Sequence, residues 1–328
     1  MTLPIAVDAM GGDFAPKEII AGARRAVDEL GLSVILVGVP ELMGDPLGLD
    51  VVACSEVIAM DDDPGASVRK KKDSSLVRAA ELVRDGKASA MVSAGNTGAT
   101  MASALLRMGR LPGVVRPCIV TPIPNPGRTP VVLVDAGANA ECTPEMLVQF
   151  AQMGSTFVAT RYGVGSPKVG LLSIGEERTK GTPLVKATHE LLDGMSTLDF
   201  VGNVEGRDIV PSPVDVIVTD GFTGNVALKT LEGAFKFVFS TILEVIGTND
   251  DTKAAGDVLL EYLLPFASRL TPESQGGAML LGVNGICVIS HGSSNATATM
   301  NAIRVAAEAS DEQIVAKLAA TIRPDQVA

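Results

Sequence analysis

The chain is poor in the residues on which several classes of protein depend. Its 328 residues include no tryptophan, two tyrosines and nine phenylalanines, so aromatic residues make up only 3%. Proteins that bind single-stranded nucleic acid stack the bases on aromatic side chains, and the net charge of -11 repels a phosphate backbone. We therefore expect no nucleic-acid partner, and attraction to an acidic surface only where basic residues are locally concentrated.

Metal-ligating and nucleophilic residues are also few. The chain has two histidines and four cysteines, which lie far apart without a CxxC pair: Cys54, Cys118, Cys142 and Cys287. This spacing predicts neither a zinc site nor a disulfide framework. We expect no metal, no cofactor and four reduced thiols, as is typical of the cytoplasm.

Several sequence signatures are missing. The patterns GxGxxG, GxxxxGK[ST] and GxSxG do not occur, which disfavours a typical dinucleotide enzyme, a P-loop NTPase and an α/β-hydrolase. The first residues lack the basic and apolar segments of a secretion signal. No run of about 20 uninterrupted apolar residues is present. We therefore expect a cytoplasmic protein.

What the sequence does contain is an alternation of short apolar runs with helical patterns. The runs are rich in β-branched residues and occupy residues 5–7, 34–37, 90–92, 131–134, 169–172 and 214–218. Continuous apolar runs are typical of strands buried on both faces, and their alternation with helices predicts a mostly parallel sheet between two helical layers. Since no repeat or linker is recognisable, residues 1–328 are treated as a single α/β domain.

Capping residues mark two helices. Pro16 to Leu30 carries apolar residues at helical spacing and is followed by Gly31. Thr143-Pro144-Glu145 predicts an N-cap, a proline at the first helical position and an acid in the first turn of a helix that ends near Tyr162.

Residues 227–270 form a helical excursion of unusual composition. Two strongly apolar segments, 235–239 and 258–266, are interrupted by charged residues and are too short to span a membrane. Three interpretations stay open: core packing, a dimer interface, or a surface that contacts the bilayer.

Glycine, aspartate and asparagine gather directly after the predicted strands. These loops are residues 8–13, 93–99, 135–139, 175–181, 202–206, 220–225 and 291–294. A single such loop is explained equally well as a turn, because turns need the same residue types for left-handed backbone and for capping. Ligands of open α/β sheets bind beyond the carboxyl ends of the strands, so we expect these loops to converge on one crevice.

These loops resemble those of the bacterial phosphate acyltransferase (PlsX) family, over essentially the whole chain. The matching stretches are VDAMGGDFAP at 7–16, SAGNTGA at 93–99, IGEE at 174–177 followed by Lys180-Gly181, DGFTGN at 220–225, GGAMLLG at 276–282 and HGSS at 291–294. Two departures are visible: Ser274-Gln275 stand where a tyrosine-containing segment is expected, and the helical excursion before them matches less well. The resemblance implies a homodimer with a three-layer Rossmann-like fold, similar to phosphotransacetylases and isopropylmalate dehydrogenases.

The resemblance also implies the reaction. A fatty acyl group moves from acyl carrier protein to inorganic phosphate, and the acyl phosphate enters phospholipid synthesis. The lipophilic product suggests peripheral contact with the membrane and with a downstream membrane acyltransferase. Three alternatives remain: a short-chain phosphotransacetylase acting on acyl-CoA, a non-catalytic scaffold that binds acyl carrier protein or membrane, and a β-decarboxylating dehydrogenase, for which no metal-binding aspartate cluster is recognisable.

This reaction suits the residues that are present. Phosphate is already an anionic nucleophile and a thiolate leaves readily, so neither a serine triad nor a metal is required. The site must hold phosphate against the thioester carbonyl and stabilise the oxyanion. We predict Lys180 and Asn225 as catalytic residues. We predict phosphate or acyl binding by Gly95, Asn96, Thr97, Gly98, Gly224 and His291. The predicted wall of the site consists of Asp8, Gly11, Gly12 and Asp13, whose acids make this loop a poor anion cradle.

One basic run stands out in an acidic chain: Arg69, Lys70, Lys71 and Lys72. Such runs are usually solvated surface. Acyl carrier proteins are strongly acidic, however, and a net-negative enzyme needs a local basic patch to dock one. We therefore predict that this run docks acyl carrier protein.

Overall fold

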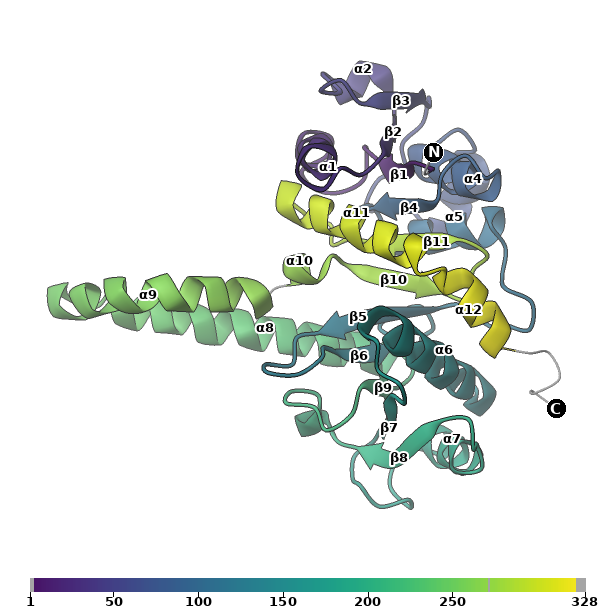
Figure 1. Ribbon diagram of the computed structural model, residues 1–328, viewed down its shortest axis with the longest axis vertical. Coiled ribbons are helices and arrows are strands. Elements are labelled where there is room, and N and C mark those ends of the chain that lie inside the picture. The colour runs from purple at the N-terminus through teal and green to yellow at the C-terminus, as the bar shows by residue number, and fades with distance from the viewer. Residues whose placement is uncertain (1–2, 271, 323–328) are drawn as a thin grey trace.

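The computed structural model describes residues 3–270 and 272–322, which form a three-layer α/β/α fold around one sheet (Figure 1). The strands are β1 (Ile5–Asp8), β2 (Val34–Gly38), β3 (Asp50–Ala53), β4 (Ala90–Ser93), β5 (Cys118–Ile123), β6 (Val131–Val134), β7 (Lys168–Leu172), β8 (Asp199–Val204), β9 (Val216–Val218), β10 (Ala278–Leu281) and β11 (Ile286–Ile289). Five of the six apolar runs of the sequence lie wholly in strands, and the sixth, 214–218, contributes its last three residues to β9; the predicted α/β class is confirmed.

Helices cover both faces of this sheet. They are α1 (Lys17–Leu30), α2 (Pro40–Met43), α3 (Pro64–Lys70), α4 (Ser75–Arg84), α5 (Thr97–Arg107), α6 (Pro144–Tyr162), α7 (Pro183–Asp193), α8 (Gly221–Ile246), α9 (Asp250–Leu270), α10 (Pro272–Gln275), α11 (Ala296–Asp311) and α12 (Ile314–Thr321). Helices α1, α6, α7, α11 and α12 share one apolar core. The opposite face carries α3, α4, α5 and the first turns of α8.

The predicted helix ends are confirmed. Gly31 ends α1 with a φ of 68° and donates its N–H to the carbonyl oxygens of Ala26 and Val27. Thr143 caps α6 by accepting the N–H of Met146, and α6 ends at Tyr162. Local capping chemistry therefore sets these boundaries.

Strand direction changes in the middle of the sheet. The strand order is β3-β2-β1-β4-β11-β10-β5-β6-β9-β7-β8. Most neighbours are parallel, as predicted, but β10 runs antiparallel to β11 and β5, and β5 runs antiparallel to β6. The carboxyl ends of β1, β4 and β11 therefore lie at one end of the strands, and those of β6, β9, β7 and β8 lie at the opposite end.

This reversal corrects the expectation that all the polar loops converge at one edge. We call the loops 8–13, 93–99 and 291–294 the first loop group, because they follow β1, β4 and β11. The segments 135–139, 175–181, 202–206 and 220–225 lie at the carboxyl ends of the oppositely directed strands and form the second loop group. Two of them are only partly loops, because residues 202–204 are the end of β8 and residues 221–225 are the start of α8.

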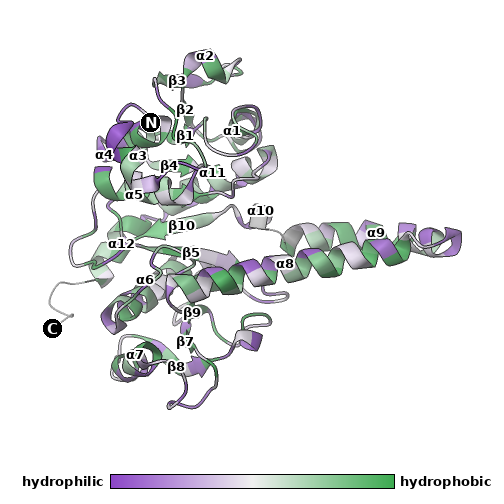
Figure 2. Ribbon diagram, turned by 180° about the vertical axis from the view of Figure 1, so that it is seen from behind, coloured by the Kyte–Doolittle hydropathy of each residue, from purple (hydrophilic) through white to green (hydrophobic). Residues whose placement is uncertain are grey.

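Helices α8 and α9 form an antiparallel hairpin that projects from the body (Figure 1), and apolar residues recur along its length (Figure 2). In α8 only Gly221 and Gly224 are buried. Phe237 and Tyr262 are 69% and 74% exposed. Core packing within one chain is therefore the wrong interpretation of the two apolar segments 235–239 and 258–266, none of whose residues is buried, whereas Ala227, Leu228 and Leu231 at the base of α8 do pack against the body. Among the described residues, no helix is long and apolar enough to cross a membrane.

Candidate active site

Asp135 is the hydrogen-bonding centre of the loop after β6, which belongs to the second loop group. It is fully buried, and its carboxylate accepts five hydrogen bonds, from the N–H groups of Ile119, Gly137, Ala138 and Asn139 and from the side-chain amide of Asn139. Burial raises the pKa of Asp135, and these hydrogen bonds act in the opposite direction. Because every partner donates an N–H, the arrangement suits an ionised carboxylate that fixes the loop after β6.

Helix α8 begins directly against this loop. Asp220 caps the helix, since its Oδ1 accepts the Thr223 N–H at 2.8 Å. The N–H of Gly221 donates to the carbonyl oxygen of Asn139 at 2.8 Å. Glycine is required at 221 because an added Cβ would lie 2.7 Å from the same oxygen.

Asn225 lies in the first turn of α8 and faces the loop after β6. A Cβ placed on Gly137 would lie 3.7 Å from both Cγ and Oδ1 of Asn225, so the Asn225 side chain lies beside Gly137 with room for about one methyl group between them. Asn225 is exposed, and its side chain has no hydrogen bond among the described residues. Its amide is therefore available to a ligand.

Lys180 lies in the neighbouring loop, between β7 and α7. Its backbone N–H donates to the carbonyl oxygen of Glu177 at 2.9 Å, and its stem packs over Gly175, where an added Cβ would lie 2.7 Å from Lys180 Cγ. The side chain is exposed and has no ion pair or hydrogen bond in the part of the chain that the structure describes. Since β7 pairs with β9, the loops that carry Lys180 and Asn225 are neighbours at one end of the sheet.

Cys142 is the thiol of the second loop group. Its Sγ donates to the carbonyl oxygen of Asn139 at 3.5 Å, and burial raises its pKa to about 11. At neutral pH it is a protonated thiol and a weak nucleophile. A covalent acyl-cysteine step at this position is therefore disfavoured.

Asp8 organises the first loop group. It is 1% exposed, its Oδ1 accepts the Met10 N–H at 3.1 Å, and its Oδ2 accepts the Ser93 hydroxyl at 2.7 Å. Ser93 Oγ in turn accepts the Gly95 N–H at 3.0 Å. A Cβ on Gly11 would lie 2.6 Å from Gly95 N and from Asp8 Oδ2, so the loops after β1 and β4 pack directly on each other. The Asp8 carboxylate thus stabilises the backbone of the loops after β1 and β4. It lies at the opposite end of the strands from Lys180.

The loop after β11 completes the first group. Asp13 donates its N–H to the carbonyl oxygen of Gly292 at 2.8 Å, and Gly12 has a φ of +109°, which favours glycine. His291 is exposed, and its Nδ1 lies 2.8 Å from the Ser293 hydroxyl. Asp13 and His291 therefore lie on adjacent loops.

The side chain of Asn96 is occupied by structural contacts. Its Oδ1 accepts the Ala99 N–H at 3.0 Å as the cap of α5. Its Nδ2 donates to the carbonyl oxygens of Met60 at 2.8 Å and Asp62 at 3.2 Å. Thr97 is exposed, and Gly98 packs on the start of α3.

The basic run divides into two kinds of residue. Lys71 is half-buried, its ammonium lies 2.5 Å from Asp62 Oδ2, and it holds the pKa of that carboxyl below its ordinary value. Arg69, Lys70 and Lys72 are exposed and have no ion pair among the described residues. Within the basic run, these three are therefore the residues that present positive charge to a partner.

The sequence did not single out Asp135 or Asn203, although both lie in segments that its polar pattern marked as loops; Asn203 belongs to β8. His189 is buried in α7 and packs edge-on against Phe200 with ring centroids 5.1 Å apart. Within residues 3–270 and 272–322 no cluster of His, Cys, Asp or Glu could hold a metal ion.

Comparison with solved structures identifies the fold. The chain is 20% identical to a phosphotransacetylase from Streptococcus pyogenes, with a TM-score of 0.62 and 94% of each chain covered. It is 12% identical to the 4-hydroxythreonine-4-phosphate dehydrogenase of Klebsiella pneumoniae, with a TM-score of 0.54, and covers 100% of that chain with 94% of its own. The fold is thus that of the α/β enzymes which include both.

Sequence comparison gives the family. A family model described as fatty acid synthesis protein matches residues 3–317. The chain is 46% identical to the phosphate acyltransferase of Nostoc sp. over 322 residues, which cover 96% of this chain and 94% of the relative. It is 48% identical to that of Desulforudis audaxviator over 323 residues, which cover 97% and 96%. The chain belongs to the phosphate acyltransferase (PlsX) family and is an enzyme of fatty acid and phospholipid synthesis.

Proposed function

We propose that the enzyme transfers a fatty acyl group from acyl carrier protein to inorganic phosphate, with Lys180 and Asn225 as its catalytic residues. A phosphate oxygen attacks the thioester carbonyl carbon, the C–S bond breaks, and the carrier thiol leaves as thiolate. Acyl phosphate is the other product. No group on the enzyme has to be acylated or deprotonated.

The observation that carries this proposal is the position of the two side chains. Lys180 and Asn225 come from loops after the paired strands β7 and β9, and both are exposed and unpaired among the described residues. An ammonium group neutralises phosphate or the developing oxyanion, and an amide donates a hydrogen bond to the same charge. The N-terminus of α8, with Gly224 in its first turn, adds a favourable dipole for an anion.

The first loop group is proposed to bind the remainder of the substrate. Because the Asn96 side chain is engaged within the chain, the backbone N–H groups of Thr97 and Gly98 at the start of α5 are the better donors. Gly95 and His291 lie beside them, and Asp8, Gly11, Gly12 and Asp13 shape the wall. Helices α5 and α8 cover the same face of the sheet, where Met101 and Leu228 pack against one apolar cluster, so an acyl group along this face would link the two groups.

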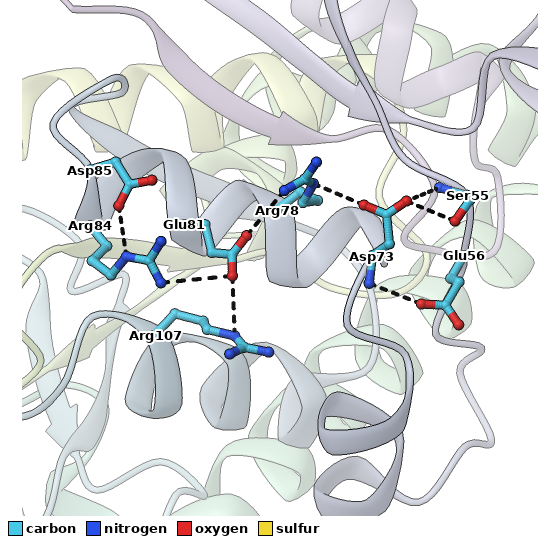
Figure 3. A network of polar contacts seen from close by, with 8 residues as sticks. All are labelled: Ser55, Glu56, Asp73, Arg78, Glu81, Arg84, Asp85 and Arg107. Atoms are coloured by element: carbon cyan, nitrogen blue, oxygen red, sulfur yellow. Dashed lines mark hydrogen bonds and ion pairs between the residues drawn. The ribbon is translucent and has the colours of Figure 1, made fainter.

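Docking of acyl carrier protein is assigned to Arg69, Lys70 and Lys72. The arginines nearby are balanced by acids, as Figure 3 shows around Glu81, which pairs with Arg78, Arg84 and Arg107. The three exposed cations of the basic run have no such partner among the described residues. They therefore offer the net positive charge that an acidic carrier requires.

The α8–α9 hairpin is proposed to form the homodimer interface and to contact the membrane. Phe237, Val238, Val258, Leu259 and Tyr262 are each more than half exposed on it, and a contiguous exposed apolar patch is typical of a surface that binds a protein or a membrane. A second copy of the hairpin would cover part of this surface, and the remainder would rest on the bilayer, where the lipophilic acyl phosphate passes to a membrane acyltransferase.

The test is an acyl-hydroxamate assay with palmitoyl acyl carrier protein and phosphate. Lys180→Ala and Asn225→Ala are expected to lower kcat at least about 100-fold. Lys186→Ala, an exposed lysine of α7, is the matched control and should retain turnover. Normal turnover of Lys180→Ala would refute the assignment.

The same assay separates the alternatives. A short-chain phosphotransacetylase would turn over acetyl-CoA faster than the carrier substrate. A non-catalytic scaffold would bind palmitoyl acyl carrier protein but release no hydroxamate-forming product from it.

A further inference from the structure

Asn203 contacts the loop that carries Lys180, although it belongs to a different strand. It lies in β8 opposite Leu171 of β7 and is 7% exposed. Its Nδ2 donates to the carbonyl oxygen of Glu177 at 3.0 Å, and the same oxygen accepts the backbone N–H of Lys180 at 2.9 Å. One carbonyl group therefore joins Asn203 to the backbone of Lys180.

The two ends of this loop are fixed by close packing. A Cβ on Gly175 would lie 2.7 Å from Lys180 Cγ. Gly181 has a φ of +102°, and a Cβ there would lie 2.9 Å from Ser173 Oγ and 2.7 Å from Val185 Cγ1. Between these points residues 176–180 are exposed. Among the described hydrogen bonds, that of Asn203 is the one that reaches their backbone from another element.

The other half of the Asn203 amide makes no hydrogen bond. Its Oδ1 is buried without a partner among the described residues. A buried polar atom without a partner costs free energy, and an apolar side chain of similar size would avoid that cost. Burial in the core therefore does not explain an amide at position 203, whereas the hydrogen bond from Asn203 to the carbonyl oxygen of Glu177 does.

We propose that Asn203 is a positioning residue that holds the Lys180 turn in register with Asn225. The inference rests on the proposed role of Lys180 and deepens it. Catalysis by a charged side chain depends on its exact place, and a shift of about 1 Å can lower a rate about 100-fold. Without the Asn203 hydrogen bond, the backbone from which the Lys180 side chain extends is no longer held in place, although the ammonium group keeps its positive charge.

The test compares two variants of Asn203 with a control variant. Asn203→Ala removes the amide, and Asn203→Asp keeps its shape but lacks the hydrogen-bond donor at neutral pH. The control is Asn125→Ala. Asn125 is 6% exposed and is also hydrogen-bonded to a backbone in another segment: its Nδ2 donates to the carbonyl oxygen of Ser212 at 3.4 Å, and its Oδ1 accepts the Ser212 N–H at 3.3 Å. It is thus a buried asparagine–backbone link far from Lys180 in the sequence. Both Asn203 variants are expected to lower kcat by about 10-fold or more, with KM for palmitoyl acyl carrier protein unchanged. Asn125→Ala should keep kcat within about twofold of the wild type.

The decisive measurement repeats Asn203→Ala in the Lys180→Ala background. If Asn203 acts through Lys180, the residual turnover changes by less than about twofold, because no ammonium group remains to be positioned. Equal losses in both backgrounds, or a kcat no lower than that of Asn125→Ala, would overturn the inference and leave the proposed role of Lys180 standing. Normal turnover of Lys180→Ala alone would instead overturn the proposed function.

Discussion

Gly224 and Asp135 leave no room for a side chain between them. A Cβ atom on Gly224 would overlap the carbonyl oxygen of Asp135, because the first turn of α8 packs directly on the loop after β6. The position of Asn225 therefore depends on a missing side chain in the preceding residue.

Gly224→Ala is expected to destabilise the protein by about 3 kcal/mol and to lower turnover, since the helix or the loop must shift. Gly233→Ala in the exposed middle of the same helix is the matched control, because no atom lies within 4 Å of its added Cβ. It should stabilise by up to about 1 kcal/mol through helix propensity. Urea unfolding measures both changes, and equal stabilities of the two variants would contradict the packing argument.

Asp8→Asn is expected to change how stability depends on pH. Burial raises the pKa of Asp8 above its unfolded value of 3.8, although hydrogen bonds from Ser75 and Ser93 oppose the shift. The folded chain thus holds this proton to higher pH than the unfolded chain does. The stability this contributes is complete below pH 3.8 and is lost as pH rises through the folded pKa.

Asp8→Asn has no such proton, so the unfolding free energy of the wild type minus that of the variant should fall as pH rises over that range. Urea titrations at a series of pH values measure the difference. A difference that grows with pH would show that the pKa of Asp8 is lowered by folding.

Reversal of two charges in the basic run tests docking. Arg69→Glu with Lys70→Glu should raise KM for palmitoyl acyl carrier protein about 5- to 10-fold and weaken its dependence on salt, because exposed charges steer association. Lys168→Glu with Lys317→Glu reverses two exposed lysines elsewhere and should leave KM unchanged. The docking role would be excluded by equal effects of the two pairs.

Polar substitutions on the hairpin test its two proposed contacts. Phe237→Asp with Val258→Asp should convert a dimer to a monomer in light scattering, since these side chains are 69% and 65% exposed in one chain. Leu260→Glu with Leu264→Glu should reduce flotation with anionic liposomes. A wild type that is monomeric in light scattering and does not float with the liposomes would contradict both contacts.

Much of this fold is predictable from local sequence. Apolar runs predicted six strands, and capping residues predicted the ends of α1 and α6, because burial and capping act over a few neighbouring residues. Strands β10 and β11 were not predicted. An apolar run reports that a strand is buried but not which way it runs, so the reversal at β10 and β5 could not be derived.

The same limit applies to the site. The sequence predicted the loops that hold Lys180 and Asn225, because their glycine and asparagine content is local. The division into two loop groups depends on strand order across the whole sheet. Asn203 was passed over because its partner is a backbone carbonyl at residue 177, and backbone positions carry no sequence signal.

Residues 278–289 supply β10 and β11, which lie between β4 and β5 at the centre of the sheet. On the ribosome, everything from β1 to α9 is made before these two strands exist. The two flanks of the sheet can each collapse around their own helices, but they cannot join by main-chain pairing until residues 278–289 have been made. A nascent chain held before that point would expose both inner strand edges, so the wait for β10 and β11 is the interval in which this protein most needs protection from aggregation.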